Sequence, residues 1–206
     1  MNIISNCLNL RKYELSKHAE IVELVLMSII ILLTPIIIPK LLDVVFGAQS
    51  AVATNSQYVV GSLVNAGLII SAINVKGWKK IVSLITFPSI SAISSGLVLK
   101  TASIFTVYMI PAIWIANFTI VYLYKYLHIN KKINYTLSSV VAIIIKTAII
   151  FSGFNILVLS NILPKSSPAI QMLKVAMGTN QIITATIGAI LAFGFINIAY
   201  KNKESN

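Results

Sequence analysis

Hydrophobic residues along the chain fall into six long runs separated by short polar connections. Each run is close to the roughly 20 residues that an α-helix needs to cross a hydrocarbon core of about 30 Å. The runs are residues 21–39, 57–75, 81–99, 104–124, 135–160 and 179–200. They lack the alternation of apolar and polar positions typical of membrane β-strands, and backbone groups in lipid must pair internally. The pattern therefore predicts an all-α bundle of six transmembrane helices.

The connections give no sign of separate domains, because most are short and no low-complexity tract or fixed-period repeat occurs. Residues 1–206 are expected to form a single transmembrane domain. The longest connection, residues 40–56, is expected to be a loop that can fold over the outer mouth of the bundle. Residues 164–178 open with a proline-bounded turn and are expected to continue as a short interfacial helix.

Composition supports a membrane protein. Hydrophobic residues make up 57% of the chain, 10% is charged, and the mean hydropathy is +0.90, well above the range of soluble domains. The first run follows basic residues as a signal peptide would, but it is long enough to span, so we expect it to be retained. These features predict a multi-pass protein of a bacterial-type cell membrane.

The net charge of +11 reflects basic residues that concentrate in alternate connections and do not build one basic face. This argues against a nucleic-acid partner. Cytoplasmic connections of membrane proteins carry an excess of Lys and Arg, so both termini are predicted to be cytoplasmic. The residues concerned are Arg11, Lys12, Lys17, Lys76, Lys79, Lys80, Lys125, Lys131, Lys132, Lys201 and Lys203.

One lysine interrupts the apolar stretch VVAIIIKTAII at residues 140–150. A charge at mid-bilayer costs about 2.5–3.5 kcal/mol on insertion scales, so Lys146 calls for an explanation. At 100° per residue, Ser139, Ala142 and Gly153 lie within about 60° of Lys146. This small and polar stripe predicts that Lys146 faces the interior of the bundle.

Polar residues in other runs lie at depths that would let them meet Lys146. With both termini inside, Asn65 falls in the outer half, Asn117 near the middle and Gln181 close to the outer surface. We expect these side chains to converge with Lys146 on a cavity reached from outside. The alternative is that such residues simply bond across helices, as the hydroxyl residues of the other runs are expected to do.

A buried cation needs an anionic or strongly accepting partner. The five acids, Glu14, Glu20, Glu23, Asp43 and Glu204, all lie at or beyond the predicted membrane boundaries. Three explanations remain open. Lys146 takes carbonyls freed by Pro88 or Pro111, it is neutral, or it meets an acidic group of a bound molecule.

Enzymatic chemistry is not expected. The chain has no HExxH, GxSxG or phosphate-loop motif, and His18 and His128 lie at the cytoplasmic boundary. The single cysteine, Cys7, excludes an internal disulfide or thiolate cluster. No cofactor or metal is implied, and uphill transport would need another protein to supply the energy.

Several short segments resemble a known family. They are VVGSLVNAGLIISA followed by a basic turn, TFPSISAISSG, MIPAIWIAN, a span with one central lysine, and QIITATIGA. Over about residues 55–195 the chain is similar to the small six-helix S components of energy-coupling factor transporters. The resemblance implies a binding subunit for a vitamin or related micronutrient, which docks on a transmembrane coupling subunit driven by two ATPases. It also implies a ligand pocket of Asn65, Asn117, Lys146 and Gln181 under a lid formed by residues 49–57.

One departure leaves the docking mode open. S components often carry an alanine-x-x-x-alanine pattern on the first helix, and the first run here has none. Small pairs occur instead at Ser62 and Ala66, Ala92 and Gly96, and Ala185 and Ala189. Two other functions remain as alternatives: a self-contained small transporter or channel, and a non-transport membrane scaffold or assembly factor.

Overall fold

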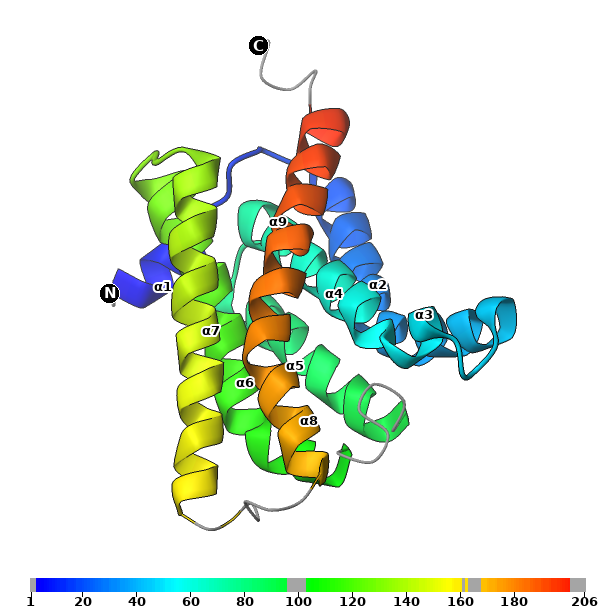
Figure 1. The fold of residues 1–206 in the computed structure, drawn as a ribbon. Coiled ribbons are helices and arrows are strands. Elements are labelled where there is room, and N and C mark those ends of the chain that lie inside the picture. The colour runs from blue at the N-terminus through cyan, green and yellow to red at the C-terminus, as the bar shows by residue number, and fades with distance from the viewer. Residues whose placement is uncertain (1–2, 96–102, 161, 163–167, 201–206) are drawn as a thin grey trace.

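The computed structural model describes residues 3–95, 103–160, 162 and 168–200, and all regular secondary structure in these residues is helical (Figure 1). This confirms the predicted all-α class. The helices are α1 (Ile3–Leu8), α2 (Lys17–Phe46), α3 (Ala51–Thr54), α4 (Ser56–Asn74), α5 (Trp78–Ser95), α6 (Ser103–Leu123), the π-helical segment η2 (Tyr124–Asn130), α7 (Tyr135–Leu159), α8 (Pro168–Met177) and α9 (Thr179–Tyr200).

Five stretches of the described chain are long and apolar enough to cross a membrane. They are Lys17–Phe46, Ser56–Asn74, Val107–Asn130, Tyr135–Leu159 and Ile170–Tyr200. The remaining expected span, 81–99, corresponds to α5. The described part of α5 is less apolar because Lys79 and Lys80 lie in its first turn. Residues 96–99 lie outside the described residues. Five candidate spans indicate a multi-pass membrane protein, and the sixth span stays a prediction.

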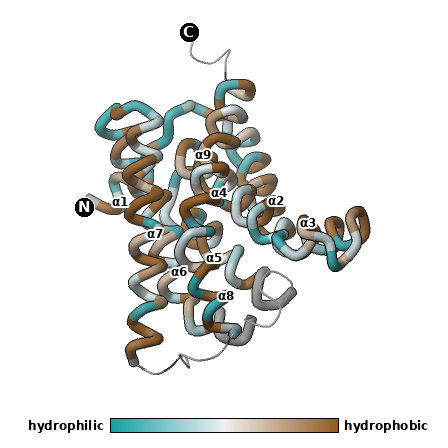
Figure 2. Tube along the Cα trace, in the orientation of Figure 1, coloured by the Kyte–Doolittle hydropathy of each residue, from teal (hydrophilic) through white to brown (hydrophobic). Residues whose placement is uncertain are grey.

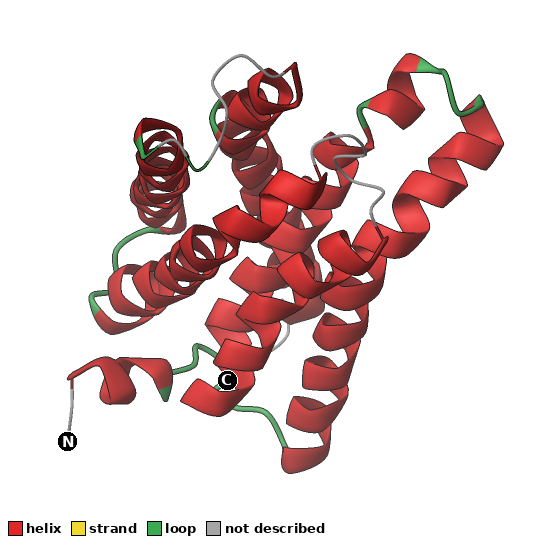
Figure 3. Ribbon diagram, turned by 90° about the horizontal axis from the view of Figure 1, so that it is seen from below, coloured by secondary structure: helices red, strands yellow, loops and turns green. Residues whose placement is uncertain are grey.

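The first long helix differs from the sequence-based expectation. The predicted loop at 40–56 is wrong over residues 40–46, because α2 continues to Phe46 and ends only at Gly47, where φ is +83°. Apolar residues occupy most of this extension, so the helical pattern persists beyond the stretch needed to span a membrane. Figures 1 and 3 both show the end of α2, with α3, projecting sideways from the bundle.

The expected helix within residues 164–178 is present as α8, but it is part of the core. Ile170, Leu173 and Met177 are buried and pack with residues of α6 and α7 such as Met109 and Phe154. Only Gly178 separates α8 from α9, and Figure 1 shows α8 at the lower end of α9. The predicted short helix is confirmed, and its position at the membrane interface stays a prediction.

Helix α4 lies at the centre of the larger core cluster, and its residues from Val64 to Asn74 are buried. The outer helices instead expose apolar side chains, such as Ile144 and Ile156 on α7 and Val22 on α2. Figure 2 shows apolar stretches along much of α7. Apolar outer surfaces are what contact with lipid requires.

Helices α4 and α9 approach closely at Gly188. A Cβ atom at this position would lie 2.6 Å from the Cβ of Asn65 and 2.8 Å from the carbonyl oxygen of Ser62. Four residues of the small pairs are buried beside this contact: Ser62, Ala66, Ala185 and Ala189. Two of the three small pairs therefore serve the chain's own helix packing. The third, Ala92 and Gly96, lies outside the described side chains.

The segments predicted to be cytoplasmic meet at one end of the bundle. The Nζ atom of Lys125 donates to the carbonyl oxygens of Leu10 and Val75, at 2.5 and 2.8 Å. Tyr13 stacks on Tyr200, with ring centroids 4.4 Å apart. We call this the basic end: residues 10–13, 75–80 and 125–134 with Tyr200. The shared end agrees with the predicted topology, whereas the side of the membrane on which it lies stays a prediction.

Candidate functional site

A cavity of about 140 Å³ lies between the helices, in the part of the bundle away from the basic end. Residues from seven helices line it: α2, α4, α5, α6, α7, α8 and α9. The four candidate residues predicted from sequence, Asn65, Asn117, Lys146 and Gln181, all border this one cavity. The structure thus brings them together as expected, and their role in binding stays a prediction.

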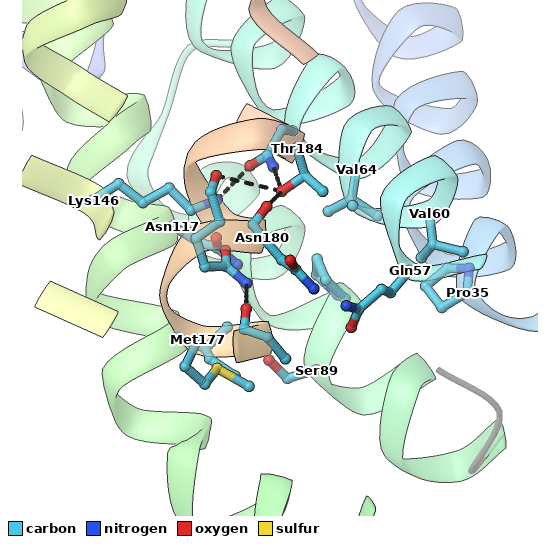
Figure 4. Close-up of a pocket in the computed structure, with 16 residues that line it drawn as sticks. Pro35, Gln57, Val60, Val64, Ser89, Asn117, Lys146, Met177, Asn180 and Thr184 are labelled. Carbon is cyan, nitrogen blue, oxygen red and sulfur yellow. Dashed lines mark hydrogen bonds between the residues drawn. The ribbon is translucent and has the colours of Figure 1, made fainter. Parts of the chain in front are cut away.

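Lys146 enters the cavity from α7 (Figure 4). The predicted interior stripe is confirmed, since Ser139 and Ala142 are buried and Lys146 is 3% exposed. Its ammonium group donates to Oδ1 of Asn65, the only acceptor that it has among the described residues. An ammonium group carries three N–H donors. Two of these donors therefore have no protein acceptor in the described part of the chain.

Asn65 connects Lys146 to the start of α9. Its amide nitrogen lies 3.4 Å from Oγ1 of Thr184, and this hydroxyl donates to the carbonyl oxygen of Asn180 at 2.8 Å. The side-chain oxygen of Asn180 accepts a 2.8 Å hydrogen bond from the hydroxyl of Tyr58. These bonds direct the Asn65 oxygen toward Lys146.

Asn180 and Thr184 were not among the candidate residues predicted from sequence. Both are buried and border the cavity. Their spacing of four residues puts them on one helix face, and Gly188 continues that face at the contact with α4. This periodicity is the signal that identifies them.

Ser89 is a further residue that the sequence-based set missed. It is 3% exposed and borders the cavity from α5, and its hydroxyl has no hydrogen-bond partner among the described residues. Asn117, from α6, donates to the carbonyl oxygen of Ile85 at 3.2 Å, so one of the two N–H groups of its amide is already used. Because a buried hydroxyl without a partner is costly, Ser89 marks a place where a ligand can supply one.

Gln181 and one residue of the expected lid border the cavity. Gln181 is half-buried, and its Nε2 atom donates to the carbonyl oxygen of Ala176 at 3.0 Å, across the junction of α8 and α9. Of the lid expected at residues 49–57, Gln57 borders the cavity. Gln49 lies in the turn between α2 and α3 and does not border it.

The remaining walls of the cavity are mostly apolar. Val60 and Val64 come from α4, Ile113 from α6 and Met177 from α8, and Pro35 and Pro88 also border the space. In Figure 4, Lys146 lies across the cavity from Val60 and Pro35, with Met177 and Ser89 below. Apolar walls with a few converging polar groups are typical of small-molecule binding sites.

The four described acids lie elsewhere. Glu14 and Glu20 pair with Arg11 near the basic end, and Glu23 accepts hydrogen bonds there from Asn74 and Tyr200. No carboxylate borders the cavity in the described part of the chain. Lys146 is thus the charge that distinguishes this site, and none of these acids pairs with it.

Lys125 is a second buried lysine, which the sequence pattern assigned only to a connection. It is 0% exposed, and its Nζ atom has the two backbone carbonyl acceptors at the basic end. Lys125 therefore joins three chain segments without bordering the cavity. The fold satisfies this structural lysine with two acceptors, whereas Lys146 has one.

No family model, curated protein or solved structure matches the chain. The similarity to S components thus rests on the short motifs of the sequence. Functional inference rests on the cavity and its hydrogen bonds.

Proposed function

We propose that the protein is the substrate-capturing membrane subunit of a micronutrient importer that is energised by a separate ATPase complex. The observation that carries the proposal is the buried side-chain nitrogen of Lys146. It borders a cavity between the helices and has one neutral acceptor among the described residues. Ionisable residues inside membrane helices are costly and typically mark a functional site.

The composition of the cavity supports capture of a small organic molecule. Its polar groups come from five helices, α4, α5, α6, α7 and α9, and apolar side chains separate them. The cavity does not cluster the His, Cys or carboxylate side chains that a transition-metal ion prefers, as far as the described residues extend. This favours a vitamin-like organic compound over a metal ion.

The need for a partner follows from what the chain contains. It has no phosphate-loop motif for binding ATP, and the described part of the cavity offers no carboxylate for coupling to protons or sodium. A coupling subunit with associated ATPases, as the motif resemblance implies, would supply the energy.

Native mass spectrometry of the gently purified protein tests ligand capture. We expect a carried-over small molecule on the parent protein and its loss from Lys146→Met. A charge-assisted hydrogen bond contributes roughly 1.5–3 kcal/mol, so affinity for that molecule should fall about ten- to a hundredfold. Thermal stability should stay the same or rise, because the substitution removes a buried charge.

Lys174→Met is the matched control. Lys174 is exposed on α8 and does not border the cavity, so this variant should keep the bound molecule. A Lys146→Met protein with lower stability and unchanged affinity would instead assign Lys146 a structural role and favour the scaffold alternative.

A further inference from the structure

We infer that the cavity takes a ligand of single-ring size with one negative charge, whose anionic group contacts Lys146 and whose ring lies between the apolar walls. This inference rests on the proposed function and specifies its substrate class. Three properties of the cavity carry it: volume, charge and an unpartnered hydroxyl.

Volume limits the size of the ligand. The cavity of about 140 Å³ is close to an engineered apolar cavity of about 150 Å³ that accommodates benzene. Sites for larger, drug-sized ligands are typically about 300–1,000 Å³. The cavity therefore matches one ring with a small substituent, and a fused two-ring compound exceeds it.

The charge of the ligand follows from Lys146. Two of its N–H donors lack acceptors among the described residues. A carboxylate-type group can accept a hydrogen bond from each of these two donors. One anionic group would neutralise Lys146, the one cation that borders the cavity among the described residues. A cationic ligand would be repelled, and a second negative charge would be buried without a partner.

Ser89 adds a second polar contact. Its buried hydroxyl has no partner among the described residues, and it borders the cavity from α5, whereas Lys146 comes from α7 (Figure 4). If the anionic group of the ligand contacts Lys146, a polar atom on the ring can form a hydrogen bond with the hydroxyl of Ser89. The ligand class is thus a small ring with an acidic group and a separate hydrogen-bonding atom.

Four probe compounds test size and charge on the purified full-length protein in lipid nanodiscs. Benzoate has the inferred size and charge, benzamide is its neutral counterpart, benzylamine is cationic, and 1-naphthoate is an anion with two fused rings. Isothermal titration should show benzoate binding at least tenfold more tightly than each of the others. Lys146→Met should remove the preference for benzoate over benzamide, and Lys174→Met should retain it.

Comparison of 3-hydroxybenzoate with benzoate tests the second contact. We expect 3-hydroxybenzoate to bind more tightly to the parent protein, and Ser89→Ala to remove this difference while retaining benzoate binding. Equal binding of the two compounds to the parent protein would overturn the role of Ser89. Ser83→Ala is a suitable control, because Ser83 lies on the same helix and is exposed.

The results separate this inference from the proposed function. Equal or tighter binding of 1-naphthoate would overturn the size limit, and equal or tighter binding of benzamide or benzylamine would overturn the charge. A carried-over ligand with two or more rings, or without an acidic group, would overturn the inference and leave the proposed function standing. Absence of any carried-over compound, together with no response to any probe, would overturn both.

Discussion

Lys146 and Lys125 are both buried, but they are held by different kinds of acceptor. Lys125 donates to two backbone carbonyl groups from separate segments, so its removal leaves both acceptors unpaired. Lys146 donates to the side chain of Asn65, which borders the cavity and is not part of a backbone connection. At the scale of single residues, the structure thus separates a lysine that joins backbone segments from one that borders a cavity.

Substitution of Lys125 should affect stability and not binding. In Lys125→Met the carbonyl groups of Leu10 and Val75 lose their donor, and each unpaired buried acceptor costs about 1–3 kcal/mol. We expect a clearly lower thermal unfolding temperature, with the affinity for the carried-over ligand unchanged below that temperature. Lys79→Met, at an exposed lysine of the same end, should unfold like the parent protein. Unchanged stability of Lys125→Met would contradict a structural role.

At the scale of elements, prolines and neighbouring helices act together. Ser91 of α5 donates to the carbonyl oxygen of Leu32, three residues before Pro35 in α2. Asn117 of α6 likewise donates to the carbonyl oxygen of Ile85, three residues before Pro88. A proline opens the preceding helical turn, so carbonyl groups there become available to other donors. In each case, a side chain from a helix packed alongside supplies this donor.

The contact between α4 and α9 gives a prediction at the same scale. In Gly188→Ala the new methyl group would meet the backbone of α4 at Ser62 and Ala66 as well as the Cβ of Asn65. Backbone atoms cannot rotate away, so the two helices must separate, at a cost of about 1–3 kcal/mol. We expect lower thermal stability. We also expect weaker ligand binding, because Asn65, which packs against Gly188 and accepts the hydrogen bond of Lys146, would be displaced.

Gly194→Ala provides the matched control on α9. A Cβ atom at Gly194 meets nothing within 4 Å, and alanine is a better helix former by up to about 1 kcal/mol. This variant should be as stable as the parent protein or slightly more so. If Gly188→Ala behaved like Gly194→Ala in thermal unfolding, the close approach of α4 and α9 would be refuted.

At the scale of the whole molecule, the basic segments lie together at one end of the bundle, so one labelling experiment can determine on which side of the membrane that end lies. We predict that the basic end faces the cytoplasm, so a cysteine at Lys79 should react with an impermeant maleimide only after the cells are permeabilised. A cysteine at Gln49, exposed in the projecting turn, should react on intact cells. Strong labelling at position 79 on intact cells would reverse the assignment.

The native cysteine should not obscure this labelling. Cys7 is 4% exposed, and burial raises the pKa of its thiol. Because the thiolate is the reactive form, this residue should react slowly with maleimide near neutral pH. Cys7 is the single cysteine of the parent protein, so maleimide labelling of the parent protein gives the background from Cys7.

The dependence on a partner is also a property of the whole molecule. Proteoliposomes that contain only this protein should bind the compound identified by native mass spectrometry without concentrating it, under either a proton or a sodium gradient. Added coupling subunit and ATPases should permit accumulation that requires ATP. Accumulation driven by an ion gradient in the absence of partners would favour the self-contained transporter.

Much of the helical architecture was determined by the sequence alone. The bounds of α4, α7 and α9 differ from the predicted runs by one residue or less, because the length and hydropathy of a membrane helix are local properties. The interior orientation of Lys146 likewise followed from the helical period and the small residues on its stripe. The four polar residues whose depths in the sequence suggested a common cavity, Asn65, Asn117, Lys146 and Gln181, do border one cavity.

Only the tertiary structure decided how those helices use their polar groups. The acceptor of Lys146 lies 81 residues away in sequence, and Lys125 is buried because the N-terminal segment and the end of α4 meet over it. The unpartnered hydroxyl of Ser89 and the core position of α8 likewise have no local signal. The physical reason is that periodicity specifies which face of a helix is turned inward, whereas the partner of each polar atom depends on which helices approach closely enough to share it.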